Sequence, residues 1–189
     1  MSITDRDKNH FDNEYILKRW DYLNSIEELA HYSIIVGYVR FYYDKPSILD
    51  VGCGEGVLLR KFSSNHYNLY HGLDFSKVAI ESCKKHANSK VELFNTNISN
   101  FETDNKFDCV IFCESLCYMK NIQQILNKFK FFLKSNGKII ISCFDELSTR
   151  QFWDHIPNEF NLISSTSVFN SKDMKWNIKL FDIPARDVT

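Results

Sequence analysis

The stretch ILDVGCGEG, residues 48–56, decides the fold of this chain. It begins in a short apolar strand, predicted over residues 47–51, and then turns through three glycines at alternate positions. Glycine lets a backbone turn sharply and come close to a ligand. In open α/β sheets, ligands bind beyond the carboxyl ends of the strands, where such a loop leads into a helix. The stretch therefore predicts a cofactor site at one edge of a sheet.

The residues after this loop alternate between strand-like and helix-like patterns. Further strands are predicted over residues 69–73, 91–94, 107–113 and 138–144, and helices over residues 57–64, 76–87 and 146–155. Another helix is predicted to begin at Asn121 and to be stopped by Asn136-Gly137 in the left-handed conformation. These alternations indicate a parallel, doubly wound α/β sheet.

The end of the chain departs from this alternation. Two strand-like segments, residues 162–169 and 176–183, are separated by only six residues. A parallel connection needs a crossover of a dozen residues or more, so the two segments are predicted to form an antiparallel hairpin. The predicted fold is therefore a seven-stranded sheet whose last strand runs antiparallel.

The residues before the loop read as helical from residue 11 to residue 43. Apolar side chains recur there at helical spacing, with a break expected near Gly37: Ile16, Trp20, Leu23, Ile26 and Leu29. We expect one domain over residues 1–189, with an N-terminal helical lid over residues 1–46 and the sheet core over residues 47–189.

The composition excludes several classes of protein. The chain has 189 residues, a net charge of −1 and 44% hydrophobic residues, which predicts a globular protein that binds no nucleic acid. Its apolar runs are shorter than the ~18–20 residues that span a bilayer, and its first 13 residues hold no apolar signal core, so we expect a cytoplasmic protein without membrane contact. Its six cysteines are expected to be free thiols that bind no metal.

Two acidic residues accompany the glycine loop. Asp50 precedes it, and Asp74 ends the second predicted strand, eighteen residues after Gly56. From that second position a carboxylate accepts hydrogen bonds from both ribose hydroxyls of a nucleoside. The alternative is that Asp74 merely caps the helix that follows. An acid beside the loop would repel a phosphate, so Asp50 and Glu55 favour a cofactor with a cationic end.

The segment from Asp50 to Gly56 resembles motif I of the class I S-adenosylmethionine-dependent methyltransferases. The strand order over residues 47–183 is also similar to that family, which implies a Rossmann-like fold. The spacing of the glycines departs from the G-x-G-x-x-G fingerprint of nicotinamide enzymes, the alternative class of cofactor site.

The resemblance implies roles for the residues of the loop and of the second strand. Gly52 and Gly54 would pass beneath the methionine part of the cofactor, and Asp50 would hold its amino group. Asp74 would bind the ribose hydroxyls, and Phe75 would flank the adenine.

The resemblance extends to the ends of the next two strands. Asn97 stands where the family usually has an acid that meets the adenine amino group, and an amide oxygen can accept the same hydrogen bond. Ile98 would pack against the adenine. Cys113, Glu114 and Tyr118 would lie beside the methionine and the methyl group. Tyr118 stands where a histidine is common and would act as a wall or as a hydroxyl handle.

The lid and the loop after the fifth strand supply the other candidates. Tyr15 and Trp20 are expected to reach the cofactor, His31 and Tyr32 the substrate; the alternative is that these side chains only pack the lid on the sheet. Trp153 and Arg150 are further substrate candidates, and an arginine could pair with a carboxylate or phosphate. The candidate catalytic residues are Tyr118 and His155, although His155 also suits an exposed surface histidine.

The chain lacks the asparagine-proline-proline-aromatic signature of amino-methylating DNA and protein-glutamine enzymes. We therefore expect a monomer or homodimer that methylates the oxygen or nitrogen of a small molecule with S-adenosylmethionine. The alternatives are a methyltransferase acting on a protein or tRNA and a non-catalytic, methyltransferase-like subunit of a partner.

Overall fold

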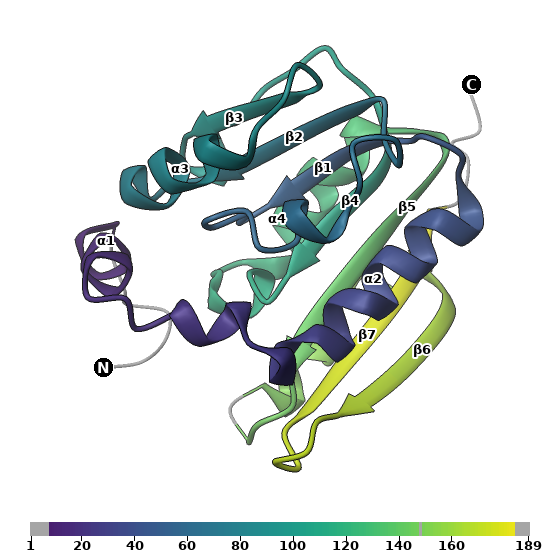
Figure 1. Cartoon of the computed structure of the whole chain (residues 1–189). Coiled ribbons are helices and arrows are strands. Elements are labelled where there is room, and N and C mark those ends of the chain that lie inside the picture. The colour runs from purple at the N-terminus through teal and green to yellow at the C-terminus, as the bar shows by residue number, and fades with distance from the viewer. Residues whose placement is uncertain (1–7, 148, 184–189) are drawn as a thin grey trace.

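Seven strands form one sheet in the order β3-β2-β1-β4-β5-β7-β6 (Figure 1). The computed structural model describes residues 8–147 and 149–183. The strands are β1 Ser47–Val51, β2 Leu69–Asp74, β3 Val91–Asn95, β4 Phe107–Cys113, β5 Leu133–Phe144, β6 Asn161–Phe169 and β7 Lys175–Asp182. β7 pairs antiparallel with β5 and β6, while the pairs among β1 to β5 are parallel. The predicted fold class and the reversed last strand are confirmed.

Hydrophobic clusters cover both faces of the sheet. β1 is buried along its whole length, and its side chains alternate: Ile48 joins the cluster under α2 (Leu29–Tyr42), whereas Leu49 and Val51 join the cluster under α4 (Ile122–Phe129). Figure 1 shows α2 lying across the sheet over β5 and β7. This two-sided burial explains why the central strands read as unbroken apolar runs.

The connection after β1 is less helical than the sequence pattern predicts. Instead of a helix over residues 57–64, the chain forms turns and one short 3-10 helix, η4 (Leu59–Lys61). Val57, Leu58 and Leu59 are all buried there. A helix on the surface buries side chains along one stripe and could not bury three consecutive residues. Turns can bury all three, so they suit this segment better than a helix.

The N-terminal segment is broken into short helices rather than one long one. These are α1 (Lys8–Ile16), η2 (Asp21–Asn24) and η3 (Ile26–Glu28), which lead into α2. Lys18 has a φ of 56° and reverses the chain after α1, so the predicted apolar face is not formed, and Ile16 and Ile26 are exposed. The break expected at Gly37 is absent, since α2 runs through it.

The other helices between the strands are short. They are α3 (Lys77–Cys83), η5 (Lys84–His86), η6 (Ile98–Asn100), η7 (Leu116–Tyr118), η8 (Lys130–Phe132) and η9 (Arg150–His155). Ser76 caps α3, because its hydroxyl accepts a hydrogen bond from the Ala79 N–H, as a serine before a helix favours. The stop predicted at Asn136-Gly137 was wrong, since α4 ends at Phe129 and both residues lie inside β5.

The described residues include no helix with the length and apolar character needed to cross a membrane. All six cysteines are free thiols, and Cys113 and Cys117 are only half-buried. Residues 1–7 of the predicted lid and residues 184–189 of the predicted core lie outside the described residues, so the domain boundaries stay a prediction.

Candidate active site

A cavity of about 480 Å³ lies at the carboxyl ends of the parallel strands, between the sheet edge and the lid. It is lined by residues that follow β1, β2, β3 and β4, by the lid, and by the first residues of β7. Every residue predicted to bind the cofactor lines it: Tyr15, Trp20, Asp50, Gly52, Gly54, Asp74, Phe75, Asn97, Ile98, Cys113, Glu114 and Tyr118. The structure brings these residues together, while their individual roles stay predictions.

The glycine loop has a backbone that other residues rarely adopt. Gly52, Gly54 and Gly56 have φ values of 81°, 52° and 76°. A Cβ on Gly52 would lie 2.4 Å from the Cβ of Ser115, and one on Gly54 would lie 2.7 Å from the Tyr15 hydroxyl. Glycine is therefore required at Gly52 both by its φ and by the close approach of the β4 loop.

Asp74 is held rigidly at the end of β2. One carboxylate oxygen accepts a hydrogen bond from the Gly54 N–H at 3.0 Å, and the other accepts one from the Ser76 N–H at 2.8 Å. Burial raises the pKa of this carboxyl to about 6, against the effect of these two bonds. Each oxygen keeps a second lone pair, so the carboxylate can still accept hydrogen bonds from a ligand in the cavity.

Asp50 has one satisfied oxygen and one free one. Its Oδ2 accepts a hydrogen bond from the Tyr70 hydroxyl at 2.5 Å, while its Oδ1 is buried and has no partner among the described residues. Burial raises the pKa of Asp50 to about 7, and Asp74 adds to the rise. A buried acceptor without a partner in a cavity wall is suited to a ligand that donates a hydrogen bond or carries positive charge.

The lid reaches the part of the cavity beside Phe75 through aromatic side chains. The ring of Phe11 lies 5.0 Å from that of Phe75 and 6.0 Å from that of Tyr118, as edge-to-face pairs. Asp12 anchors α1 there, because its carboxylate accepts hydrogen bonds from the Ser76 hydroxyl and the Val78 N–H. The lid thus closes over the end of β2.

Asn97 lies in the wall after β3, where the sequence places it. Its side-chain oxygen already accepts a hydrogen bond from the Ser99 N–H at 2.9 Å and so caps η6. A contact with an adenine amino group would have to use the second lone pair of that oxygen.

Glu114 turns into the cavity from the end of β4 with a φ of 54°. Its Oε1 accepts a hydrogen bond from the Ser142 hydroxyl, and its Oε2 accepts one from the Phe144 N–H at 2.8 Å. Burial raises its pKa to about 7, and the charge of Glu28 adds to the rise. Left-handed backbone in a residue other than glycine is uncommon and gathers at functional sites.

Four of the substrate and catalytic candidates do not line the cavity. His31 is fully buried behind it, stacked 5.0 Å from the ring of Trp176. Arg150, Trp153 and His155 lie in η9, whose buried Phe152 packs in the cluster on the face opposite α2. Arg150 and His155 are exposed, and the ring of Trp153 lies beneath the Lys179 ammonium. Tyr32, the remaining substrate candidate, does line the cavity.

Several lining residues were not predicted from the sequence: Phe11, Glu28, Phe144 and Trp176. The sequence holds no clear signal for Glu28, because it stands next to Glu27 and an acidic pair is typical of an exposed surface. Trp176 gave no signal either, because an aromatic residue in a strand ordinarily belongs to the core.

Several known proteins are similar to this chain. A family model described as a methyltransferase domain matches residues 44–179. The ubiquinone biosynthesis O-methyltransferase of Rickettsia typhi is 29% identical over 134 residues, which is 68% of this chain and 54% of that protein. The (S)-tetrahydroprotoberberine N-methyltransferase of Eschscholzia californica is 28% identical over 115 residues, which is 58% of this chain and 32% of that protein. The chain spans about half or less of the length of these curated relatives.

Solved structures share the fold. The N-methyltransferase NodS from Bradyrhizobium japonicum, in complex with S-adenosylhomocysteine, superposes with a TM-score of 0.71 at 18% identity, covering 87% of this chain and 91% of that one. Magnesium protoporphyrin IX methyltransferase from Synechocystis has a TM-score of 0.72 at 13% identity, covering 97% of this chain and all of that one. The chain belongs to the class I S-adenosylmethionine-dependent methyltransferases.

The residues present fit the cofactor of that family. S-adenosylmethionine carries a primary amino group, two ribose hydroxyls and an adenine, and no phosphate. The unpartnered Asp50 Oδ1 suits the amino group, and the spare lone pairs of Asp74 suit the hydroxyls. A Cβ on any of the three loop glycines would meet Ser115, Tyr15 or Cys83 at 2.4–2.7 Å, so the loop can follow this path only with glycine.

Proposed function

We propose that this chain transfers a methyl group from S-adenosylmethionine to an oxygen or nitrogen of a small-molecule acceptor. One observation carries the proposal: Asp50 and Asp74 line the same cavity beside a glycine loop. Among the described residues the Oδ1 of Asp50 has no hydrogen-bond partner, and the oxygens of Asp74 can each accept a further hydrogen bond. Membership of the methyltransferase family supports it, as do the O- and N-methyltransferases among the relatives.

We infer the position of the acceptor relative to the cofactor from the strand order. With Asp74 at the end of β2 and Asp50 at the end of β1, the cofactor extends from the β3 side of the sheet to β1. The part of the cavity that remains lies over β4, β5 and β7, where Glu114, Phe144 and Trp176 line it. The acceptor would enter there, beneath η2 and η3.

The protein's contribution is positioning and the exclusion of water. The cofactor supplies a methyl group on a cationic sulfur, which leaves as a neutral thioether. Asp50, Asp74 and the loop glycines would hold the cofactor in one orientation. Tyr118, in the wall after β4, would confine the methyl group, whereas His155 lies outside the cavity and is given no role here.

The charge of the cavity favours a small molecule over tRNA. Among the described residues, Lys120 is the one basic residue that lines the cavity. Five acidic residues line it: Glu28, Asp50, Glu55, Asp74 and Glu114. A nucleic-acid backbone would be repelled by such a wall. The volume of about 480 Å³ falls within the roughly 300–1,000 Å³ of small-molecule pockets.

Calorimetric titration tests the proposal directly. We expect S-adenosylmethionine and S-adenosylhomocysteine to bind with micromolar affinity and NADH not to bind. Transfer of tritium from a labelled methyl donor to small oxygen and nitrogen acceptors would then establish the reaction. Binding of NADH alone would favour the oxidoreductase alternative, and binding of none of the three would favour a non-catalytic subunit.

Asp74→Ala should weaken the binding of S-adenosylmethionine by about 10- to 100-fold. The variant loses charge-assisted hydrogen bonding to the ribose, and the loss of one such bond costs about 1.5–3 kcal/mol. Calorimetry on the variant provides the measurement, and Asp104→Ala, which removes an exposed acid outside the cavity, serves as the control. An unchanged dissociation constant for Asp74→Ala would refute the ribose assignment.

A further inference from the structure

The end of the cavity that the cofactor leaves free combines two acids with aromatic walls. We call it the acceptor chamber, and its lining residues are Tyr22, Glu28, Tyr32, Glu114, Phe144 and Trp176. Glu28 comes from the lid in η3, and Glu114 comes from the sheet edge after β4. Two elements far apart in the sequence therefore bring their carboxyl groups to one chamber.

Glu28 is the less expected of the two acids, because no charged cation lies within ion-pair distance of it in the described part of the chain. Its side chain is only 3% exposed, and among the described residues it forms no hydrogen bond. Among the described residues, the one basic group within 4 Å of Glu28 is the His31 ring, at 3.8 Å, and burial lowers the pKa of that histidine to about 3. His31 is therefore uncharged at neutral pH, and Glu28 has no cation beside it.

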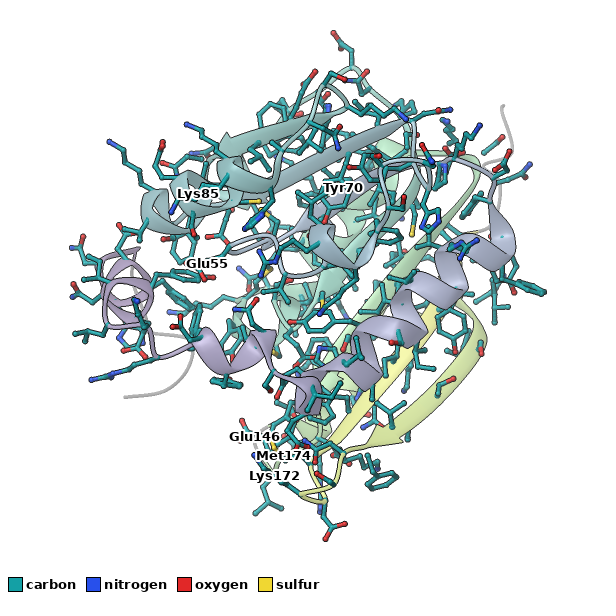
Figure 2. The ribbon with its side chains drawn as sticks, viewed as in Figure 1. Glu55, Tyr70, Lys85, Glu146, Lys172 and Met174 are labelled. Atoms are coloured by element: carbon teal, nitrogen blue, oxygen red, sulfur yellow. The ribbon has the colours of Figure 1, made fainter. Side chains whose placement is uncertain are left out.

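The negative charge of Glu27 affects Glu28 more than the positive charge of Lys172 does. Glu27 raises its pKa and the Lys172 ammonium, in the exposed turn before β7, lowers it, while burial has the largest effect and brings it to about 7. Figure 2 shows Lys172 beside Met174 at the end of that hairpin. The Glu28 charge also raises the pKa of Glu114. Burying two carboxylates without a counterion is costly unless a ligand supplies the positive charge.

The carboxylates of Glu28 and Glu114 differ in the hydrogen bonds that they already accept. Both oxygens of Glu114 accept hydrogen bonds, from Ser142 and from the Phe144 N–H, so its position is fixed. Glu28 has all its lone pairs available to a ligand. This arrangement suits one fixed negative charge and one group that can bind and then take a proton.

The walls of the chamber suit a cation as well. Tyr32 and Trp176 belong to the buried cluster, and the rings of Phe144 and Trp176 lie 5.5 Å apart. Burial together with the charges of Glu114 and Glu28 raises the pKa of Tyr22 and of Tyr32, which places both phenols near the two acids as neutral groups. Faces of aromatic rings attract ammonium groups, most strongly where water is excluded.

We propose that the acceptor is an amine, that it enters the chamber as its ammonium ion between Glu28 and Glu114, and that Glu28 accepts its proton. This inference rests on the proposed function. A phenol or alcohol would bring no charge to the two acids, and a phenolate would be repelled by them.

The reaction balances with these groups alone. One ammonium proton passes to the Glu28 carboxylate and frees the nitrogen lone pair. The lone pair forms the new C–N bond while the C–S bond breaks, and sulfur keeps that electron pair. The methylated ammonium ion leaves, and Glu28 returns its proton to solvent.

Calorimetry on protein saturated with S-adenosylhomocysteine tests the inference at pH 8, with three small aromatic probes. Phenethylamine and benzyltrimethylammonium are cations, and 2-phenylethanol is neutral. We expect both cations to bind at least tenfold more tightly than the alcohol. Glu28→Gln should weaken the binding of both cations at least tenfold and leave the affinity for the alcohol within twofold.

The controls separate this inference from the proposed function. Glu27→Gln changes an acid in the same helix that does not line the cavity, and should behave as the unaltered protein. The affinity of Glu28→Gln for S-adenosylhomocysteine should stay within threefold, which also shows that it is folded. Equal binding of alcohol and cations, no binding of the cations, or full cation affinity in Glu28→Gln would overturn the amine assignment. Failure of the unaltered protein to bind S-adenosylhomocysteine would instead overturn the proposed function, and this inference with it.

Discussion

Gly52→Ala is expected to lower the affinity for S-adenosylmethionine at least 100-fold and to destabilise the fold. The new Cβ would lie 2.4 Å from the Cβ of Ser115. Rotation of a side chain cannot relieve this contact, so the backbone would have to move. The φ of 81° adds strain of roughly 1–2 kcal/mol for a residue other than glycine, and overpacking adds about 1–3 kcal/mol. Ser115 cannot move away cheaply, because its hydroxyl donates a hydrogen bond to the Val51 carbonyl.

Gly37→Ala provides the matched control for this change. Gly37 lies inside α2, and a Cβ there would meet nothing within 4 Å. Alanine is favoured over glycine in a helix by about 1 kcal/mol, so this variant should unfold at a slightly higher temperature and bind the cofactor normally. Thermal unfolding and calorimetry on both variants make the comparison. Cofactor binding by Gly52→Ala that matches Gly37→Ala would contradict the role given to the loop.

The glycine loop shows why part of this site could be predicted from sequence. The loop, Asp50 and Asp74 are close together along the chain or fall at the ends of consecutive parallel strands. Parallel strands bring their carboxyl ends to one edge, so local patterns were sufficient to place Asp74 beside Gly54. The same reasoning correctly reversed β7, because the turn before it is too short for a crossover.

The acceptor side could not be predicted in this way. Glu28 reaches the cavity because the lid breaks after α1 and turns, and this path depends on tertiary contacts such as that between Asp12 and Ser76. His155 and Arg150 were expected at the cavity, but η9 packs its Phe152 against the opposite face of the sheet. Apolar spacing shows that a segment packs on the sheet, and it does not show on which face.

Asp50→Asn is expected to make the cofactor-free protein more stable at alkaline pH while weakening its cofactor binding at least tenfold. Asp50 is 1% exposed, and burial raises its pKa from 3.8 to about 7. At about 1.4 kcal/mol per pKa unit, the buried charge lowers the free energy of unfolding by about 4 kcal/mol above pH 7. Asparagine can still accept the Tyr70 hydrogen bond, but it offers no charge to a cationic amino group.

The difference in stability between the unaltered protein and Asp50→Asn should depend on pH in a defined direction. Below about pH 4 the Asp50 carboxyl is protonated in both the folded and the unfolded state, so the two proteins differ little there. Between pH 4 and pH 7 the folded state alone keeps the proton, so the unaltered protein loses stability relative to Asp50→Asn as the pH rises, and the difference levels off above pH 7. His31, whose pKa burial lowers to about 3, has the opposite effect in acid, but it is common to both proteins and cancels in the difference. Urea unfolding at pH 4, 5.5, 7 and 8.5 measures this curve, and a stability difference that is constant over that range would show that Asp50 does not carry the buried charge.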